Sequence, residues 1–443
     1  MICQIQRWKG LECWILGGNT DWECVHPLVA LDDLLRQRIE HVRVKQTLGE
    51  WTPITIHFDG SVVPRDRHNP FKGSMFAAYP GDLVFSKIDA RNGAIGLVPD
   101  NLPRVVVTSE YPVHFPDSKQ VDARYMTMLL RTPNFLKLIR DAASGTSGRK
   151  RITPEKFRAI EIPLPGLKHQ CHLVAAYESA LNKANELEAQ AKQIERDAQR
   201  EFEAALGLTP FPNLPKRPFQ IAHFKDIERW SHDGILQASL FGNSLPESRF
   251  EIVSLSEIAR VSYGLQKCPA NRPGKHARPY LRVANVQRGY LDLREIKKIN
   301  VLDADMPKYK LQDGDVLLCE GNSVDLVGRG AIWRNEIADC VHQNHVLRVR
   351  VAQDTALPDF LLAYINSSVG LSYFRSKAKR TTNLASINST EVSGLPVPLP
   401  PKDIQTRCVR ELQDASRKVK VLQDGAAKQR LAAWNEFISA IFV

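Results

Sequence analysis

The most regular hydrophobic pattern in the chain lies between Gln170 and Gly207, where small and apolar residues recur at alternating steps of four and three. Glu, Lys, Gln and Arg fill the positions between them, which is typical of a coiled-coil helix with one apolar seam. The same register returns near the end of the chain, from Cys408 to Ala440, when Leu173 is aligned with Cys408. The pattern therefore predicts two long helices with matching seams. The residues predicted to pack between these helices are Leu173, Tyr177, Leu187, Ile194, Leu412, Val419 and Leu422.

Alanine is frequent in both seams, so the two helices can approach each other closely. We expect them to pair in antiparallel orientation, although the heptads alone also allow parallel pairing or a partner in another molecule. The first seam runs over 33 residues from Leu173 to Ala205, which corresponds to about 50 Å of helix. Antiparallel pairing would place two globular units at opposite ends of the helices, related by a pseudo-twofold axis.

The segments outside the helices also occur twice. VALDDLL near the start resembles VSLSEIA, and GDLVFSKIDARNGAIG from Gly81 resembles GDVLLCEGNSVDLVGRGAIW from Gly314. The second pair predicts a Gly-Asp turn, a short strand, a glycine-containing loop and another strand. When Gly93 is paired with Gly330, the second copy has four extra residues in this loop.

From about Tyr125 onward the two copies keep one constant offset, the same that aligns Leu173 with Cys408. RYMTMLLRTPNFLKLIR corresponds to FLLAYINSSVGLSYFR, and AIEIPLP corresponds to GLPVPLP. The prolines end each globular part before the long helix. The sequence therefore predicts an internal duplication with an α+β fold, in which two similar mixed α/β domains are separated by two long antiparallel coiled-coil helices. The predicted segments are 1–165 for the first domain, 166–207 for the central helix, 208–400 for the second domain with a Pro-rich linker at 208–219, and 401–443 for the C-terminal helix.

Composition indicates an ordinary globular protein with a basic character. The 443 residues are 43% hydrophobic and 25% charged, which is close to the average for globular proteins. The chain shows no apolar run long enough to cross a membrane, no signal-peptide core, and no CxxC pair among its eight cysteines. These features predict a cytoplasmic protein with reduced thiols. The net charge of +11 favours a polyanionic partner, with nucleic acid as the first candidate.

Basic segments occupy corresponding places in the two copies. SGTSGRKR at Ser144–Arg151 corresponds to RSKAKRTTN at Arg375–Asn383, and a third basic stretch covers Leu265–Arg288. Arg and Lys neutralise phosphates, while Ser, Thr and Asn add hydrogen bonds to the backbone or the bases. A solvated surface loop is the alternative for each segment. The candidate DNA-binding residues are Lys87, Arg91, Asn92, Thr146, Ser147, Arg149, Lys150, Arg151, Lys267, Arg272, Lys275, Arg282, Asn322, Arg329, Lys377, Lys379, Arg380, Thr381 and Thr382.

No motif of a known catalytic type is complete in the sequence. It contains no GxxxxGK[ST] phosphate loop and no glycine fingerprint for a dinucleotide or a methyl donor. Cys340, His342 and His345 are close enough in sequence to hold a metal ion, but they supply only three ligands and have no counterpart in the other copy. We therefore predict no catalytic residues and no metal site.

In the order of its duplicated features, the chain resembles the specificity subunit of type I restriction-modification systems. The residues that carry this resemblance are the paired VALDDLL and VSLSEIA segments, the two Gly-Asp loops, the ITPEKFRAIEIPLP and INSTEVSGLPVPLP stretches, and the paired heptads. The resemblance covers essentially everything after about residue 25, and it leaves the extension before Trp22 without an assigned role.

The resemblance implies a function in phage defence. In that family each variable domain is a target-recognition domain that reads one half of a split DNA sequence. The helices fix the gap between the halves and dock two adenine-methyltransferase subunits, and restriction subunits with translocase and nuclease activity join the complex. The specificity subunit itself is not an enzyme. S-adenosylmethionine, ATP and Mg are accordingly expected on the partner subunits, and no cofactor is expected on this chain.

The two variable domains share little sequence identity, so the resemblance implies a non-palindromic DNA target. A separation of about 50 Å corresponds to roughly 15 base pairs of DNA. Two other readings remain open from the sequence. The chain could be a stand-alone DNA-modifying or DNA-cleaving enzyme, or a coiled-coil scaffold protein without DNA specificity.

Overall fold

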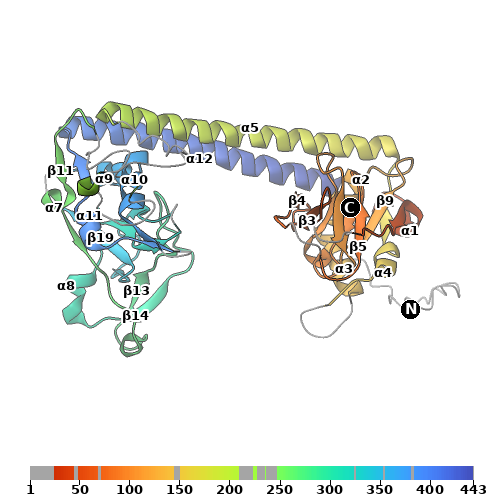
Figure 1. The fold of residues 1–443 in the computed structure, drawn as a ribbon, viewed down its shortest axis with the longest axis horizontal. Coiled ribbons are helices and arrows are strands. Elements are labelled where there is room, and N and C mark those ends of the chain that lie inside the picture. The colour runs from red at the N-terminus through yellow and green to blue at the C-terminus, as the bar shows by residue number, and fades with distance from the viewer. Residues whose placement is uncertain are drawn as a thin grey trace. The chain divides into compact units, whose positions relative to one another are not determined.

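The computed structural model describes residues 24–43, 48–67, 71–143, 150–208, 223–226, 235, 247–323, 326–352, 355–380 and 384–442 (Figure 1). The chain divides into two compact units, and each contains parts of both long helices. Unit 1 comprises Met1–Glu188 and Gln423–Val443, and unit 2 comprises Ala189–Leu422. The N-terminal extension before Trp22 and positions 209–219 of the predicted linker lie outside the described residues.

Unit 1 contains two four-stranded sheets, with strand orders β2-β9-β6-β7 and β4-β3-β8-β5, and the antiparallel pair β1-β10. Its strands are β1 (Leu28–Ala30), β2 (Leu35–Arg38), β3 (Thr52–Ile56), β4 (Val62–Pro64), β5 (Met75–Ala78), β6 (Leu83–Phe85), β7 (Ile95–Leu97), β8 (Val105–Thr108), β9 (Val113–Pro116) and β10 (Glu161–Pro163). Its shorter helices are α1 (Leu31–Leu34), η2 (Ala90–Asn92), α2 (Ala123–Leu130), α3 (Pro133–Ala142) and α4 (Pro154–Arg158).

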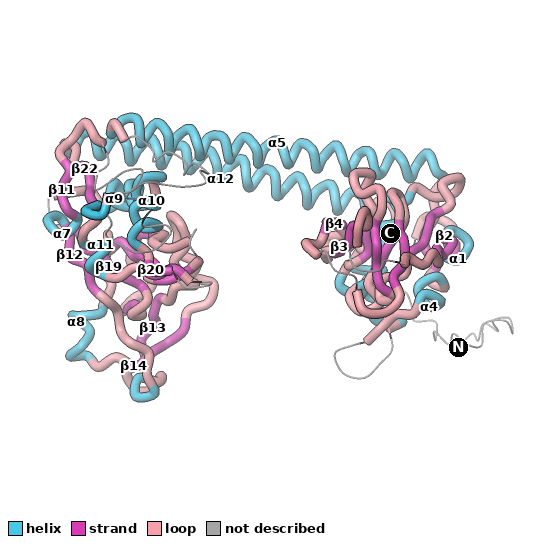
Figure 2. The backbone as a smooth tube through the Cα atoms, in the orientation of Figure 1, coloured by secondary structure: helices cyan, strands magenta, loops and turns pink. Residues whose placement is uncertain are grey.

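Unit 2 contains a four-stranded sheet of order β12-β19-β15-β17, the three-stranded sheets β14-β13-β18 and β16-β21-β20, and the pair β11-β22 (Figure 2). Its strands are β11 (Ile252–Ser254), β12 (Ala259–Ser262), β13 (Ala277–Leu281), β14 (Lys297–Asn300), β15 (Val316–Cys319), β16 (Gly321–Asn322), β17 (Gly330–Ile332), β18 (Val341–His342), β19 (Val346–Val351), β20 (Lys379–Arg380), β21 (Ala385–Ser386) and β22 (Pro396–Pro398). Its shorter helices are η3 (Phe224–Asp226), α7 (Leu255–Ile258), η4 (Pro269–Asn271), η5 (Asp303–Asp305), α8 (Met306–Tyr309), α9 (Pro358–Ile365), α10 (Ser368–Lys377) and α11 (Ser389–Ser393).

The predicted internal duplication and mixed α/β fold are confirmed. One constant offset, which carries Ala123 to Pro358 and Pro163 to Pro398, moves the bounds of α2, α3, α4 and β10 onto those of α9, α10, α11 and β22. The sheet β2-β9-β6-β7 has the same strand order and antiparallel pairings as β12-β19-β15-β17. Two stretches of different sequence therefore form the same topology.

The strand register corrects the predicted alignment of the glycine-containing loops. In unit 1 Leu83 pairs with Leu97, and in unit 2 Val316 pairs with Ile332. When the two units are aligned by this register, Gly93 of unit 1 corresponds to Gly328 of unit 2 and not to Gly330. Both of these glycines have positive φ, 103° and 73°, a conformation that glycine adopts readily. The second copy therefore has two extra residues in this loop, and the prediction of four was wrong.

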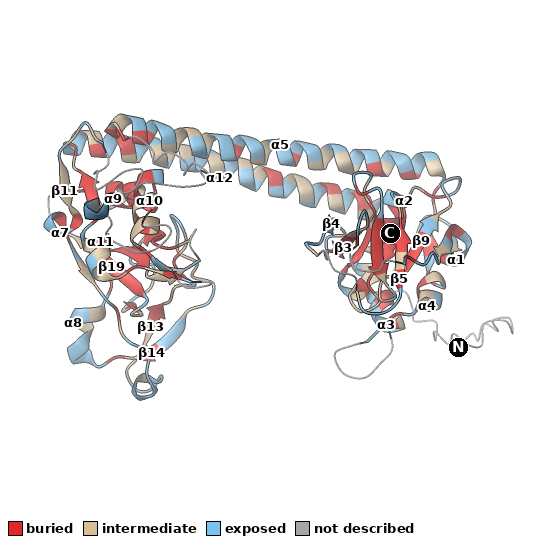
Figure 3. Ribbon diagram, viewed as in Figure 1, coloured by how far each residue is buried: buried red, intermediate tan, exposed pale blue. Residues whose placement is uncertain are grey.

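Each unit has its own hydrophobic core, in which helices cover one face of a sheet (Figure 3). In unit 1, Phe85 of β6 packs with Tyr125 of α2 and Phe135 of α3. In unit 2, Leu318 of β15 packs with Phe360 of α9 and Phe374 of α10. Burial of such large side chains contributes roughly 2–3 kcal/mol each, so the helix pairs α2-α3 and α9-α10 anchor the two sheets.

The two long helices are α5 (Leu167–Leu206) and α12 (Lys402–Ser439). In unit 1 the ring of Tyr177 lies 5.8 Å from that of Trp434, and Arg430 donates to Asn185 at 2.7 Å. From the first contact to the second, residue numbers increase along α5 and decrease along α12. The expected antiparallel pairing is therefore confirmed in this unit. In unit 2, Ile194 and Leu412 border the same cavity between the helices.

The seam residues are less exposed than the residues that flank them. Ala184 and Ala191 of α5 and Ala426 of α12 are almost fully buried, which allows the close helix approach expected from alanine. The seven predicted packing residues are all half-buried: Leu173, Tyr177 and Leu187 in unit 1, and Ile194, Leu412, Val419 and Leu422 in unit 2. Among the helices that the structure describes, none has the length and apolar character needed to cross a membrane.

Candidate nucleic-acid interface

A Gly-Asp turn starts the strand that leads to the candidate loop of unit 1. Gly81 has a φ of 83°, which permits the tight turn. The buried carboxylate of Asp82 accepts the backbone N–H of Tyr79 at 2.9 Å and pairs with the guanidinium of Arg38 at 2.8 Å. The turn is therefore fixed by hydrogen bonds at a buried site, and β6 leaves it toward Lys87.

Unit 2 repeats this turn with a different arginine. Gly314 has a φ of 85°, and Asp315 accepts the N–H of Gln312 at 2.7 Å. The partner of Asp315 is Arg350 of β19, which donates from Nε at 2.6 Å. In unit 1 the arginine comes instead from β2, the strand next to β9. The carboxylate therefore has the same position in both copies, whereas its arginine partner comes from β2 in unit 1 and from β19 in unit 2.

In unit 1 the structure brings the loop of the candidates Lys87 and Arg91 beside the end of the basic segment Ser144–Arg151. The backbone carbonyl of Lys87 accepts the N–H of Ile152 at 2.9 Å, so the loop after β6 lies beside the segment that carries Lys150 and Arg151. Arg151 pairs with Glu110 at 3.1 Å, while Lys150 is exposed. Helix η2 follows Lys87 and carries the half-buried Arg91 and the exposed Asn92. Thr146, Ser147 and Arg149 lie outside the described residues.

Unit 2 brings the corresponding segments together in the same way. The carbonyl of Glu320 accepts the N–H of Ile387 at 2.9 Å. Strand β21 then pairs with both β16 and β20, with Ala385 opposite Asn322 on one side and opposite Arg380 on the other. Three candidates, Asn322, Lys379 and Arg380, are therefore placed on one small sheet. Thr381 and Thr382 lie outside the described residues, and Lys377 is half-buried at the end of α10.

The remaining candidates of unit 2 differ in exposure. Lys267, Arg272 and Lys275 are exposed around η4. Arg282 is half-buried and pairs with Glu295 at 3.4 Å. These placements do not test DNA contact, so all of these candidates stay predictions.

Arg329 is buried and does not lie at the exposed tip of a charged loop. Its side chain is 8% exposed, and Nη2 donates to the carbonyl of Val283 at 3.4 Å. The guanidinium also faces the buried thiol of Cys319, whose pKa is raised by burial. A structural part in supporting the loop is therefore the direct interpretation of its position, and any contact with DNA stays a prediction.

Each unit also presents an exposed aromatic residue that the sequence reasoning missed. In unit 1 the N–H of His57 donates to the carbonyl of Ser61 at 2.9 Å and closes the hairpin between β3 and β4. Phe58, at the tip of this hairpin, is 60% exposed. A Cβ on Gly93 would lie 2.3 Å from the carbonyl oxygen of Phe58. The aromatic tip therefore rests directly on the glycine-containing loop.

Unit 2 has a matching tip. The N–H of Gln287 donates to the carbonyl of Tyr290 at 3.0 Å, and the N–H of Gly289 donates to the carbonyl of Gly330 at 2.8 Å. Tyr290 is 63% exposed. The Asp-Gly and Arg-Gly dipeptides mark both turns in the sequence, but the sequence carries no local sign of their contact with Gly93 in unit 1 or with Gly330 of β17 in unit 2.

The two units thus repeat one backbone arrangement, in which a basic segment lies beside the loop that follows the Gly-Asp strand and an exposed aromatic residue lies at the adjoining turn. Lysine and arginine neutralise phosphates, and aromatic rings stack on unpaired or splayed bases. Within the described part of these loops, no titratable side chain is buried next to carboxylates, as a general acid or base often is. Exposed cations and an exposed ring at one place are suited to binding nucleic acid, which stays a prediction.

Cys340, His342 and His345 do not face one another as metal ligands. Buried Cys340 donates to the carbonyl of Val341, and His342 bonds through Nδ1 to the carbonyl of Val346 at 2.8 Å. Exposed His345 bonds to Glu320 at 2.6 Å. Burial raises the pKa of the Cys340 thiol to about 12 and lowers the pKa of His342 to about 4. Within the described part of the chain, His, Cys, Asp and Glu form no group of three or more suited to a metal ion.

Comparison with known proteins agrees with the resemblance found in the sequence. No family model matches the chain. It is 25% identical over 272 residues to the type I restriction enzyme EcoKI specificity subunit of Escherichia coli K12, covering 61% of this chain and 53% of that protein. It is 27% identical over 171 residues to the putative type I restriction enzyme MjaX specificity subunit of Methanocaldococcus jannaschii, covering 38% and 40%. The chain therefore spans about half the length of the curated relatives that it matches.

A solved chain from a study of complex assembly and conformational transition of the type I R-M system shares the fold. The TM-score is 0.54 at 16% identity, over 94% of this chain and 96% of that one. The chain is thus similar in sequence to type I restriction enzyme specificity subunits and similar in fold to a chain of such a system. The resemblance stated from the sequence is confirmed.

Proposed function

We propose that the chain is the DNA-recognition subunit of a type I restriction-modification complex and that it has no catalytic activity of its own. The observation that carries this proposal is the repeated interface. Each unit sets the loop that follows its Gly-Asp strand beside a basic segment, at 150–151 or at Lys379–Arg380, and an exposed aromatic residue, Phe58 or Tyr290, lies at the adjoining turn. One such surface would bind one stretch of DNA, and two copies in one chain suit a target with two half-sites.

The two half-sites would differ in sequence, because the two interfaces share a backbone plan but not their side chains. Phe58 of unit 1 corresponds to Tyr290 of unit 2, and Lys87, whose carbonyl accepts from Ile152, corresponds to Glu320, whose carbonyl accepts from Ile387. Base readout depends on donors and acceptors at defined places in the groove. Different side chains on the same plan would therefore read different bases and give an asymmetric, bipartite target.

The long helices would fix the gap between the half-sites. Helix α5 has 40 residues and α12 has 38, so each is about 60 Å long. A length of this order exceeds one turn of DNA, which is about 34–36 Å. We propose that the paired helices act as a spacer and leave an unread stretch between the two half-sites.

The same helices would dock the enzymatic subunits. Val421 of α12 is 70% exposed in unit 2 and Leu431 is 61% exposed in unit 1, and exposed apolar side chains on a helix are suited to a protein interface. We propose two adenine-methyltransferase subunits and the restriction subunits as partners. S-adenosylmethionine, ATP and Mg would be bound by these partners rather than by this chain.

The proposal is tested by the modified-adenine motifs of host DNA with and without the gene for this chain. The expected result is the loss of one split motif when the gene is deleted and its return on complementation. An unchanged set of motifs, with the partner genes expressed, would contradict the proposal. The purified chain alone is expected neither to methylate nor to cleave DNA, and either activity would favour a stand-alone enzyme.

A further inference from the structure

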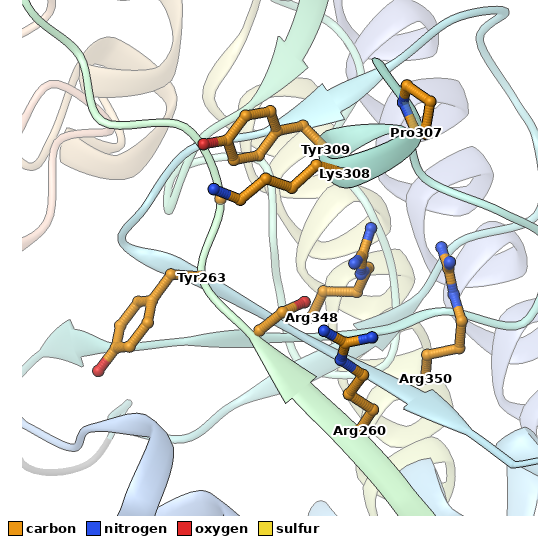
Figure 4. Close-up of a pocket in the computed structure, with 9 residues that line it drawn as sticks. Arg260, Tyr263, Pro307, Lys308, Tyr309, Arg348 and Arg350 are labelled. Atoms are coloured by element: carbon orange, nitrogen blue, oxygen red, sulfur yellow. The ribbon is translucent and has the colours of Figure 1, made fainter. Parts of the chain in front are cut away.

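A cavity in unit 2 gathers basic side chains from three elements. It has a volume of about 370 Å³ and lies between α8 and the sheet β12-β19-β15-β17. Figure 4 shows Lys308 and Tyr309 of α8 on one side and Arg260, Arg348 and Arg350 of strands β12 and β19 on the other. We call it the arginine cavity.

Arg348 has no carboxylate partner among the residues that line this cavity. Its side chain is 7% exposed, and Nη1 donates to the carbonyl of Lys310 at 3.1 Å. Within the described structure its Nε has no hydrogen-bond partner, and neither has the inaccessible hydroxyl of Ser262, which borders the same cavity. Buried polar groups in folded proteins are almost always hydrogen-bonded. Both atoms are inaccessible, so a ligand in the cavity would meet the charge of Arg348 rather than these two donors.

The charges around the arginine cavity do not balance. Arg350 is neutralised by Asp315, whose two oxygens accept from it at 2.6 and 2.7 Å. The lining residues include no Asp or Glu, so Arg260, Lys308 and Arg348 have no carboxylate among them. Like charges held together in a concave site of low dielectric attract anions strongly.

The described part of unit 1 has no equivalent of this cluster. In unit 2 the strand pairing sets Arg260 opposite Arg350, and Ser262 opposite Arg348. At the corresponding positions of β2 and β9, Arg36 lies opposite Phe115, and Arg38 lies opposite Val113. The strand β9 thus supplies no arginine at either position. The excess of positive charge belongs to unit 2 and is not a requirement of the shared fold.

We propose that the arginine cavity binds a phosphate group, with the guanidinium groups of Arg348 and Arg260 and the ammonium of Lys308 as donors. Guanidinium groups match the oxygen spacing of phosphate and can donate two parallel hydrogen bonds to it. The phosphate is either a phosphodiester of bound DNA or a free phosphate ion. The first source rests on the proposed function, and it would give unit 2 a backbone contact that unit 1 lacks.

The first arm of the test measures DNA binding by the full chain. Arg260→Ala with Lys308→Ala removes two exposed charges from the cavity. Arg36→Ala with Lys298→Ala removes two exposed charges from other strands and is the matched control. Fluorescence anisotropy with a duplex of arbitrary sequence, at several salt concentrations, should show at least about tenfold weaker binding for the cavity variant than for the control. For the cavity variant, the slope of log K against the logarithm of the salt concentration should also be smaller in magnitude by about one, the change expected when one phosphate contact is lost.

The second arm uses inorganic phosphate and thermal unfolding. Phosphate should raise the melting temperature of the wild-type chain relative to chloride of equal ionic strength. The increase should be lost in the double variant and in Arg348→Met, whose own melting temperature in chloride shows whether it is folded.

The two arms of the test distinguish DNA from free phosphate as the ligand. They also distinguish a failure of the cavity proposal from a failure of the proposed function. Weaker DNA binding identifies the DNA backbone as the source, while a lost phosphate effect with unchanged DNA binding identifies a free ion. The proposal is overturned if the cavity variant matches the control in DNA binding and phosphate stabilises no protein or all of them equally. Failure of the wild-type chain to bind DNA would refute the proposed function, and the phosphate arm would still decide on the cavity.

Discussion

Gln170 and Gln405, which occupy corresponding positions in the two copies, make the same two hydrogen bonds in their respective units. Both side chains are buried, with exposures of 0% and 1%. The side-chain carbonyl accepts the backbone N–H of Asp122 or Leu357, the N-cap residue of α2 or α9, at 2.8 Å in both cases. The side-chain amide donates to the carbonyl of the proline five residues earlier, also at 2.8 Å. Each glutamine thereby ties the start of a long helix to its globular unit.

Substitution of these glutamines should destabilise the protein. Gln170→Ala removes three hydrogen bonds, since the amide also donates to the carbonyl of Gln120 at 3.1 Å, and Gln405→Ala removes two. Each should lower the free energy of unfolding by about 2–4 kcal/mol, because buried backbone groups lose their partners. Gln193→Ala, at an exposed position of the same helix α5, should change it by less than about 0.5 kcal/mol. Urea unfolding measures all three, and equal values for Gln405 and Gln193 would refute the anchoring role.

Two buried histidines should make stability depend on pH. Burial lowers the pKa of His114 and His342 to about 4 from an ordinary 6.5. The unfolded chain then binds more protons than the folded chain between pH 6.5 and 4, so stability is lost as pH falls through this window. Between pH 7 and pH 4.5 each histidine should account for a loss of about 2–3 kcal/mol.

Urea unfolding at the two pH values checks this dependence. His114→Phe, whose ring would lie beside the stacked rings of Phe85 and Phe157, should reduce the loss by the share of one histidine. His169→Gln removes an exposed histidine and serves as the control, which should leave the loss unchanged. The same loss for His114→Phe and for the wild type would show that His114 is not the group responsible.

The contact between Gly93 and the Phe58 tip should not tolerate a side chain. Gly93→Ala places a Cβ 2.3 Å from the carbonyl oxygen of Phe58 at a φ of 103°. Gly73→Ala is a matched control, because Gly73 has a φ of 96° but its Cβ would meet nothing within 4 Å. We expect a loss of about 1 kcal/mol for Gly73→Ala and about 2–4 kcal/mol for Gly93→Ala. Thermal unfolding compares the two, and equal losses would mean that the contact does not constrain the loop.

The aromatic tips should contribute to DNA affinity without contributing to stability. Phe58→Ala and Tyr290→Ala should each weaken binding of target DNA by about 1–3 kcal/mol if the rings stack on bases. Their melting temperatures should remain close to that of the wild type, since both rings are more than half exposed. Ile39→Ala removes an apolar side chain of unit 1 with similar exposure, 65%, and should leave affinity unchanged. If all three variants bind DNA like the wild type, the tips lie outside the interface.

Features that depend on local periodicity could be predicted from the sequence. The heptads of α5 and α12 and the repeats of α2, α3 and α4 follow from short-range patterns and a constant offset. The basic segments at Ser144–Arg151 and Arg375–Asn383 were found in the same way, because they occupy corresponding places in the two copies. These predictions needed no knowledge of how distant segments meet.

Features that depend on the approach of distant segments could not be predicted. The Gly93 alignment failed because the register of β6 with β7 is set by pairing and not by the nearest glycine. The burial of Arg329 follows from the position of the Val283 carbonyl, which lies far away in the sequence. The alternation in VLRVRV places Arg348 and Arg350 on one face of β19, but only the fold shows that α8 encloses them.

The proposed function requires two reading units that a helical spacer holds at a fixed distance. Insertion of one heptad into both α5 and α12, at corresponding seam positions, would lengthen the pair by about 10 Å while keeping the seam in register. The modified-adenine motif should then keep both half-sequences and gain roughly three unread base pairs between them. An unchanged spacer with retained methylation would contradict the account.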